Sequence, residues 1–347
     1  MTDLDTEMVA AATASRNVAD ATVIIIAYTM ERWSLTCAAV DSVLNQTLPP
    51  REIILCVEGS SEFAERFREQ WPQEPGSVPA IRVQRQEPTP PAGGRERASY
   101  ACKGSRAGAE RNRGVMLAEG EVVVFLDDDA AAEPDWLRRL LAPFADPAVV
   151  GVGGAPLPVY AKPRPRWFPS EFDWVFGCAY KGLPTETAPA ARLIGANMAV
   201  RRDSFLAVGG FQSMAEDMDM SHRLWKLSPD SRLVYEPRAI VRHYVPEDRL
   251  TWHYFWRRCF SAGRAKVSVL KGLGPAANMS AERSFLARSL TLGVASGLRE
   301  FLGGDAGGLE RALSIIAGTA VSAVAYAVGV VEWSVPFLRE RQSNSEF

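Results

Sequence analysis

An apolar run, EVVVFL at Glu121–Leu126, stands directly before three consecutive aspartates. Its length and its β-branched content predict a strand. Runs at 22–27 (TVIIIA) and Glu52–Val57 predict two more strands, and helical stretches follow them, from Glu31 to about Gln46 and near Ser61–Gln70. Strands that alternate with helices predict an α/β fold, with a mixed, mainly parallel sheet and helices on both faces.

Three segments fall outside this alternation. Residues 1–20 carry acids where a signal peptide would carry bases and lack an apolar core, so we expect a disordered N-terminus without a secretion signal. Residues Glu87–Ser105 are dense in Pro, Gly and Arg and predict a mobile loop over a site. Residues Pro156–Pro189 are rich in Pro and Trp and predict an excursion that faces the substrate.

The end of the chain, residues 271–347, differs in composition from the main domain at 21–270. Its segment Leu313–Val331 has no charged residue and reaches the length of about 19 residues that can span a bilayer. Its many Ala, Gly and Ser residues weaken the drive for insertion. We therefore expect helices that contact a membrane, as a span or as an interfacial hairpin. The alternative is a helix that packs on the main domain or in a dimer interface.

Composition narrows the partners. The 39 basic and 41 acidic residues give a formal net charge of −2, which leaves no broad basic surface, so we expect no nucleic acid partner. The five cysteines are widely spaced and include no CxxC pair. The sequence therefore predicts neither a disulfide framework nor a zinc site.

The aspartates Asp127, Asp128 and Asp129 come at the carboxyl end of the predicted strand Glu121–Leu126, where open α/β sheets place their ligands. Carboxylates there suit Mg²⁺ or Mn²⁺, and such a cation can bridge a diphosphate and neutralise the charge that develops as it leaves. The alternative is a solvated acidic turn that caps the next helix.

A second acidic pair, Glu216 and Asp217, stands at the opening turn of a predicted helix with an apolar stripe. A carboxylate held there can remove the proton of a hydroxyl nucleophile as it attacks. The alternative is a pair of acids that only caps the helix.

A basic, aromatic segment follows, and three of its arginines, Arg257, Arg258 and Arg264, are candidates to hold a diphosphate, because guanidinium groups match phosphate oxygens. His243 follows a predicted strand, AIVRH, and its ring could complete a metal shell. The alternatives are a solvated or membrane-facing basic helix and a structural histidine.

Three stretches carry a resemblance, in this order: VIIIAYTMERWSLTCAAVDSVLNQTLPPREIIL, GAERNRGVMLAEGEVVVFLDDD, and GANMAVRRDSFLAVGGF followed by AEDMD. Over roughly residues 22 to 266 the chain resembles the family 2 glycosyltransferases, which have the GT-A fold. The stretches PSEFDWVFGCAYKGLP and LIGANMAV resemble a subgroup that acts on polyprenyl-linked sugars, such as glucuronosyltransferases that use glucosyl dolichyl phosphate.

The resemblance implies an inverting transfer of one sugar from a nucleoside-diphosphate sugar of the UDP-linked kind to a hydroxyl acceptor, a lipid-linked or surface glycan precursor, at the cytoplasmic face of the cell membrane. It implies Asp217 as the base, with Glu216 in support, and a divalent metal (Mn²⁺ or Mg²⁺) at Asp127 and Asp129, with His243 as a further candidate. The residues that it implies for donor binding, with the arginines above, are Ala27, Tyr28, Glu31, Glu58, Arg111, Asp127, Asp128, Arg257, Arg258 and Arg264.

The sequence departs from the family pattern in places. Ile26 and Thr29 replace the usual proline and asparagine at the end of the first strand. In CVEGS, Glu58 stands where an aspartate usually binds the nucleotide base of the donor, which leaves a preference for uridine open. FWRRCFSAGR only loosely matches the signature of processive members, which favours transfer of a single sugar. A nucleotidyltransferase on a similar sheet, or a non-catalytic membrane-tethered carbohydrate-binding protein, is the rival interpretation.

Overall fold

A computed structural model describes residues 18–57, 61–73, 76–85, 106–212, 216–273, 287 and 289–334. The predicted N-terminal segment up to residue 17, Glu58 and the whole of the predicted loop 87–105 lie outside the described residues. The bounds of the elements in the first half are β1 (Ala19–Ala27), η1 (Met30–Arg32), α2 (Trp33–Leu44), β2 (Pro50–Val57), α3 (Ser61–Gln70), β3 (Ala80–Arg85), α4 (Arg106–Leu117) and β4 (Val122–Asp127).

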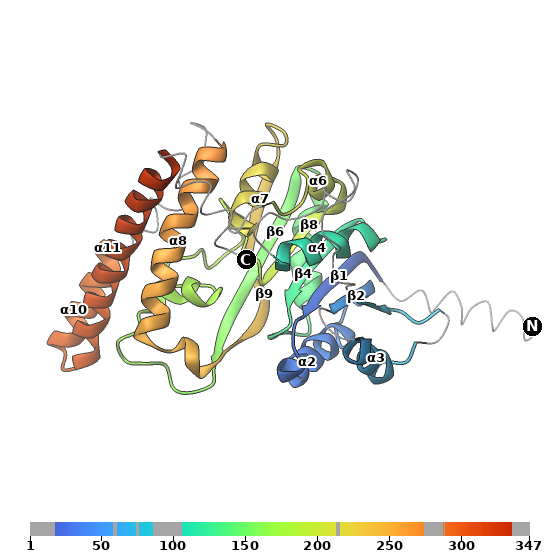
Figure 1. The fold of residues 1–347 in the computed structure, drawn as a ribbon, viewed down its shortest axis with the longest axis horizontal. Helices are drawn as coiled ribbons and strands as arrows, with labels where there is room; N and C mark the ends of the chain where they lie inside the picture. The colour runs from blue at the N-terminus through green and yellow to red at the C-terminus, as the bar shows by residue number, and fades with distance from the viewer. Residues whose placement is uncertain are drawn as a thin grey trace, which may run out of the picture.

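The first half of the sheet is parallel, in the spatial order β3-β2-β1-β4. Alternate residues of β1 point to opposite faces, as a strand requires. Val23 and Ile25 pack in the apolar cluster that also contains residues of α2 and α3, whereas Ile24 and Ile26 pack in a second cluster with Val115 of α4. Helices therefore cover both faces, as predicted, with α2 and α3 on one side and α4 on the other (Figure 1).

The second half of the sheet is mixed, and its elements are β5 (Ala130–Ala132), α5 (Trp136–Leu141), η3 (Ala142–Ala145), β6 (Val149–Tyr160), η4 (Ser170–Phe176), β7 (Ala188–Pro189), β8 (Asn197–Arg201), α6 (Arg202–Ala207), α7 (Glu216–Trp225) and β9 (Arg232–Val245). Strand β8 pairs antiparallel with both β4 and β6, and β6 pairs parallel with β9. The short β5 pairs antiparallel with β9, so that Ala130 stands opposite His243. This last pairing brings His243 beside the aspartates that precede β5.

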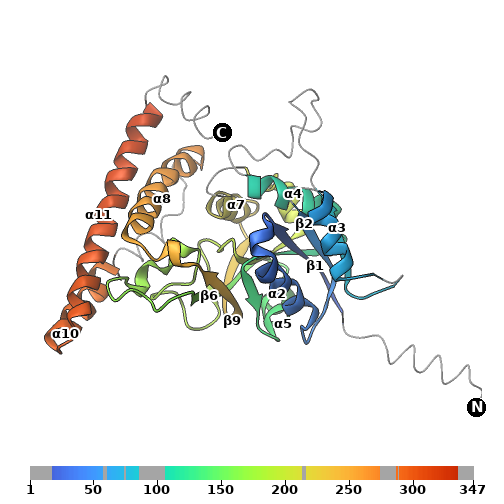
Figure 2. The ribbon, with the colours of Figure 1, turned by 60° about the horizontal axis from the view of Figure 1, so that its bottom comes forward.

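The C-terminal helices lie together at one end of the molecule (Figures 1 and 2). They are η5 (Glu247–Arg249), α8 (Trp252–Leu273), the π-helical turn η7 (Ser289–Gly293), α10 (Val294–Leu302) and α11 (Ala306–Ser334). Glycines let α8 and α11 approach closely: a Cβ atom added at Gly263 would lie 2.3 Å from the carbonyl oxygen of Ser322. Ile315 of α11 joins an aromatic cluster with Phe172 and Phe255, so α11 is packed onto the main domain by one face.

Helix α11 is, by length and composition, the one helix in the described part of the chain that could cross a membrane. Its most apolar window has a mean hydropathy of 1.9, and 28% of that window is buried. All of its exposed residues from Leu313 to Val331 are Leu, Ile, Val, Ala or Tyr. The predicted boundary at residue 270 falls near the end of α8, whose contacts with α11 join the two predicted parts.

Candidate active site

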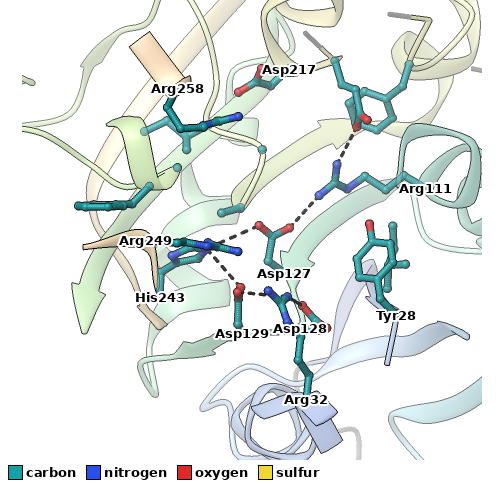
Figure 3. A pocket seen from close by; sticks show the side chains of 18 of the residues that line it. Tyr28, Arg32, Arg111, Asp127, Asp128, Asp129, Asp217, His243, Arg249 and Arg258 are labelled. Carbon is teal, nitrogen blue, oxygen red and sulfur yellow. Dashed lines mark hydrogen bonds and ion pairs between the residues drawn. The ribbon is translucent and has the colours of Figure 1, made fainter. Parts of the chain in front are cut away.

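A pocket of about 370 Å³ opens at the carboxyl ends of β1 and β4, within the size range of small-molecule sites. It is walled by segments that are far apart in the sequence (Figure 3). Its lining residues are Ile26, Tyr28, Arg32, Arg111, Asp127, Asp128, Asp129, Phe176, Gly177, Ile194, Gly195, Ala196, Phe211, Glu216, Asp217, His243, Arg249, Tyr254 and Arg258. Both predicted acidic clusters and His243 are therefore in one pocket.

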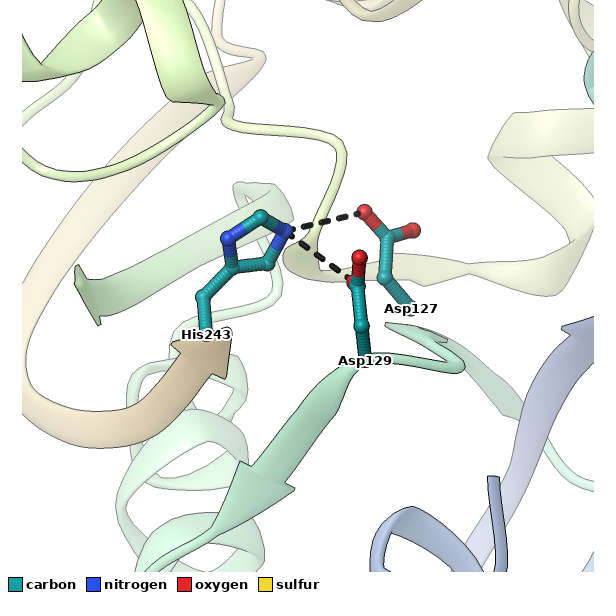
Figure 4. Close-up of side chains that lie close together, drawn as sticks. All are labelled: Asp127, Asp129 and His243. Carbon is teal, nitrogen blue, oxygen red and sulfur yellow. Dashed lines mark ion pairs between the residues drawn. The ribbon is translucent and has the colours of Figure 1, made fainter. Parts of the chain in front are cut away.

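Asp127, Asp129 and His243 converge on one point of this pocket (Figure 4). His243 Nε2 lies 3.2 Å from Asp129 Oδ1 and 3.8 Å from Asp127 Oδ2. One potential ligand atom from each residue lies within 4.8 Å of the others, and each offers an oxygen or nitrogen suited to a divalent cation. The backbone fixes this arrangement, because the N–H of Tyr244 donates to the carbonyl of Asp129 at 2.8 Å.

The charges in this cluster are closely balanced. Burial lowers the pKa of His243, but hydrogen bonds to Asp127 and Asp129 outweigh it and raise that pKa well above its ordinary value. Burial raises the pKa of Asp127, yet His243 and Arg111 together bring it well below its usual range. The two carboxylates stabilise a positively charged, protonated imidazole beside them. A metal cation bound at the same place would supply positive charge in the same way, so the cluster suits a cation.

Asp128 faces away from His243 (Figure 3). Arg32 donates to Asp128 Oδ1 at 2.7 Å and lies 3.2 Å from Asp129 Oδ2. Burial raises the pKa of Asp128 to about 7, although Arg32 opposes this. Arg32 therefore orients two of the three aspartates, and its place one turn after β1 gave no signal of this in the sequence.

Arg111 connects the two acidic clusters. Its side chain, 14% exposed, donates to Asp127 Oδ1 at 2.7 Å and to Glu216 Oε2 at 2.8 Å. Glu216 Oε1 also accepts the N–H of Gly108 at 3.0 Å. Burial raises the pKa of Glu216 despite the nearby guanidinium. The opening turn of α7 is thus tied to α4, and this ordered contact holds the neighbouring Asp217 in place.

Asp217 lies on the pocket wall opposite Asp127 (Figure 3). Its Oδ1 accepts the N–H of Met218 at 2.8 Å, and a Cβ atom at Gly195 would lie 3.9 Å from its Oδ2. In the described part of the chain, no arginine, lysine or histidine forms an ion pair with this carboxylate. A half-buried carboxylate with these contacts can accept a proton from a group bound in the pocket.

Only one of the three predicted arginines of α8 lines the pocket. Arg258 does so, and its Nε donates to the carbonyl of Val175 at 3.2 Å. Arg257 is exposed and stacks over the ring of Tyr254. Arg264 pairs with Glu332 of α11 at 2.7 Å, because this turn of α8 faces the C-terminal helix. Arg249, which the sequence analysis did not single out, lines the pocket next to His243 (Figure 3).

Two other predicted donor contacts do not reach the pocket. Glu31 is exposed at the start of η1–α2, and Ala27 is fully buried at the end of β1. Tyr28, between them, does line the pocket, and burial raises its pKa above the ordinary value. The turn after β1 therefore presents Tyr28 and Arg32 to a ligand.

Comparisons with known proteins agree with this arrangement. The sequence profile of Glycosyl transferase family 2 matches residues 22–209. The glucosyl-dolichyl phosphate glucuronosyltransferase of Haloferax volcanii is 28% identical over 257 residues, 70% of this chain and 75% of that protein. Human polypeptide N-acetylgalactosaminyltransferase 6 is 27% identical over 64% of this chain, which spans only 37% of that longer protein.

A solved structure shares the fold. The mannosyltransferase from Pyrobaculum calidifontis, in complex with GDP-Man and Mn²⁺, superimposes with a TM-score of 0.51 at 17% identity. The match covers 95% of this chain and 84% of that chain, so it extends past the main domain into the C-terminal helices. The expected GT-A fold is confirmed.

Proposed function

Because this chain belongs to Glycosyl transferase family 2, we propose that it moves one sugar from a nucleoside-diphosphate sugar to a hydroxyl acceptor, with inversion at the anomeric carbon. One observation carries the proposal. A single pocket holds an Asp-Asp-His cluster suited to a cation and, on the opposite wall, a carboxylate that no basic side chain of the described residues neutralises. A diphosphate leaving group and an attacking hydroxyl need those two features on opposite sides of the sugar.

The donor's diphosphate lies at the Asp127, Asp129 and His243 end of the pocket. Asp127, Asp129 and His243 would hold a divalent cation, which would neutralise the charge that develops on the leaving diphosphate. The imidazole favours Mn²⁺ over Mg²⁺, because Mg²⁺ prefers oxygen ligands alone. Arg249 and Arg258 line the same pocket and supply guanidinium groups for phosphate oxygens.

The acceptor hydroxyl lies at the Asp217 end. Asp217 removes its proton as the oxygen attacks, because a neutral hydroxyl is a poor nucleophile. Glu216 is not free for this role, since Arg111 and the N–H of Gly108 already engage both of its oxygens. Glu216 instead fixes the opening turn of α7 and with it the direction of Asp217.

The acceptor is carried by a lipid, and the protein meets the cytoplasmic face of the membrane through α11. The relative from Haloferax volcanii, whose name includes dolichyl phosphate, supports this acceptor class. The exposed face of α11, from Leu313 to Val331, is apolar for roughly 27 Å at 1.5 Å per residue. Its other face is packed against α8 and the aromatic cluster, so α11 lies in the interface instead of crossing the bilayer.

The proposal is tested by incubating purified protein with UDP-, GDP- and TDP-sugars, with and without Mn²⁺, and measuring the nucleoside diphosphate released. One donor should give a Mn²⁺-dependent signal. Asp217→Asn should lower the transfer rate to a lipid-linked acceptor by about 10²–10⁴-fold, the contribution of a general base. Asp203→Asn, an exposed first-turn aspartate of α6, is the matched control and should be silent.

No turnover of any donor, with lipid-linked acceptors present, would favour the non-catalytic carbohydrate-binding interpretation. Full activity in Asp217→Asn with a metal-dependent wild type would remove Asp217 from the mechanism and leave the donor site intact.

A further inference from the structure

The imidazole of His243 has a second partner on the side away from the aspartates. Its Nδ1 lies 3.4 Å from the sulfur of Cys178. Cys178 is fully buried and His243 is 3% exposed, so water has little access to this contact. The two residues come from different elements, since Cys178 follows η4 and His243 lies on β9. The contact therefore joins the ring to a separate segment of the pocket wall.

The thiol of Cys178 is itself held in place. Its backbone N–H donates to the carbonyl of Asp173 at 3.2 Å, and its sulfur lies 4.0 Å from the carbonyl oxygen of Phe176. A thiol is both a weak donor and a weak acceptor. When the S–H points to the Phe176 carbonyl, a sulfur lone pair remains for an N–H on Nδ1 of His243.

A histidine can coordinate a metal through Nε2 only when the proton is on Nδ1, and the group that accepts from Nδ1 selects that tautomer. In the described part of the chain, Cys178 Sγ is the side-chain atom that contacts Nδ1 of His243. Nε2 then faces Asp127 and Asp129. The three contacts of the ring thus agree on one orientation, and when a cation takes the place of the proton on Nε2, the remaining proton lies on Nδ1 and points to Cys178.

We propose that Cys178 is a positioning residue, which keeps the proton of His243 on Nδ1 and so presents Nε2 to the metal ion of the proposed function. The inference rests on that metal site. The contact between Cys178 and His243 also links the metal site to the pocket wall, because Phe176 and Gly177, directly before Cys178, line the pocket. A shift of this segment would therefore turn a metal ligand.

The experiment measures Mn²⁺ affinity of the full chain without any sugar donor, from the electron paramagnetic resonance signal of free Mn²⁺. Cys178→Ala should weaken Mn²⁺ binding about tenfold, at the low end of the 10–100-fold usual for such partners, since sulfur accepts weakly. Cys178→Ser keeps a donor and acceptor and should restore most of the affinity. Cys56→Ala removes another buried thiol, 3.8 Å from a carbonyl, and is the matched control.

The Nδ1–H···Sγ hydrogen bond is read separately from the ring ¹⁵N shifts of the Zn²⁺-saturated protein, because Zn²⁺ is diamagnetic and suits imidazole, and the His243 signals are identified by their loss in His243→Gln. The wild type and Cys178→Ser should show a hydrogen-bonded N–H on Nδ1 of His243, and Cys178→Ala should shift that signal. Mn²⁺ affinity within twofold of the wild type in Cys178→Ala, with an unchanged Nδ1 signal, overturns the inference and leaves the proposed metal site standing. A wild type that binds no Mn²⁺ overturns both.

Discussion

Replacing Arg111 with methionine separates the two acidic clusters. Arg111 is 14% exposed, and its partners Asp127 and Glu216 are 28% and 11% exposed. Removing one member of a buried ion pair costs about 3–5 kcal/mol, because the partner is left buried and uncompensated. The partial exposure of Asp127 places the expected loss in the free energy of unfolding at about 3 kcal/mol for the metal-free protein.

A bound cation offsets part of this loss. It compensates Asp127, a proposed ligand, but not Glu216, which lies on the far side of Arg111. With saturating Mn²⁺ the loss should therefore fall to roughly 1.6 kcal/mol, about half of the metal-free value. Mn²⁺ thus restores about 1.4 kcal/mol of the unfolding free energy of Arg111→Met. Because binding and stability are thermodynamically linked, the variant should bind Mn²⁺ about tenfold more tightly than the wild type does. Activity should fall all the same, because α7 and Asp217 lose their anchor.

The assay is urea unfolding with and without Mn²⁺, together with a direct titration of Mn²⁺. Arg113→Met is the matched control, since Arg113 lies on the same helix, is 41% exposed and pairs with Glu110. This control should leave Mn²⁺ affinity unchanged. Equal or weaker Mn²⁺ binding by Arg111→Met would refute the reasoning, because it would mean that Arg111 and the cation do not share Asp127.

Two further predictions concern the membrane and pH. The double variant Ile316→Glu and Val324→Glu should lower binding to anionic lipid vesicles at least about tenfold, because each exposed apolar side chain contributes roughly 1.5–3 kcal/mol when buried. Met116→Glu, on the exposed side of α4, is the control. If the double variant instead dissociates a dimer in light scattering, the exposed face of α11 is a protein interface. Burial raises the pKa of Asp173 to about 7, above its unfolded value near 3.9, so its ionisation destabilises the fold progressively from about pH 4 to 7. The melting temperature of Asp173→Asn relative to the wild type should therefore rise across that range, and a constant difference would contradict the assignment.

The sequence predicted those parts of the fold that depend on local pattern. The strand runs at 22–27 and Glu52–Val57 are long and β-branched, and both form strands of the parallel half of the sheet. β5 is three alanines and β8 is only five residues long, so neither carries a strand signal of its own. They exist because β4 and β9 offer unpaired edges beside them. A pairing made by neighbours cannot be seen from one segment alone.

The same distinction explains the site. Adjacent acids at a strand end or a helix start were visible, but three other side chains around the site, Arg32, Arg249 and Cys178, come from other elements. Their positions depend on the β5–β9 register and on the course of the chain after β6, which no local pattern contains.

The arginines of α8 show most clearly which features of the site a sequence pattern cannot predict. Arg257, Arg258 and Arg264 lie within eight residues, so the sequence grouped them as one phosphate-binding set. A helix turns by about 100° per residue, so adjacent positions face in different directions. Arg258 reaches the pocket, Arg257 stacks on Tyr254 at the surface, and Arg264 pairs with Glu332 of α11, which lies 68 residues further along the chain. A basic run in the sequence shows where arginines lie along the chain. Which of these arginines can contact a phosphate depends on how the helix that carries them packs against the rest of the protein.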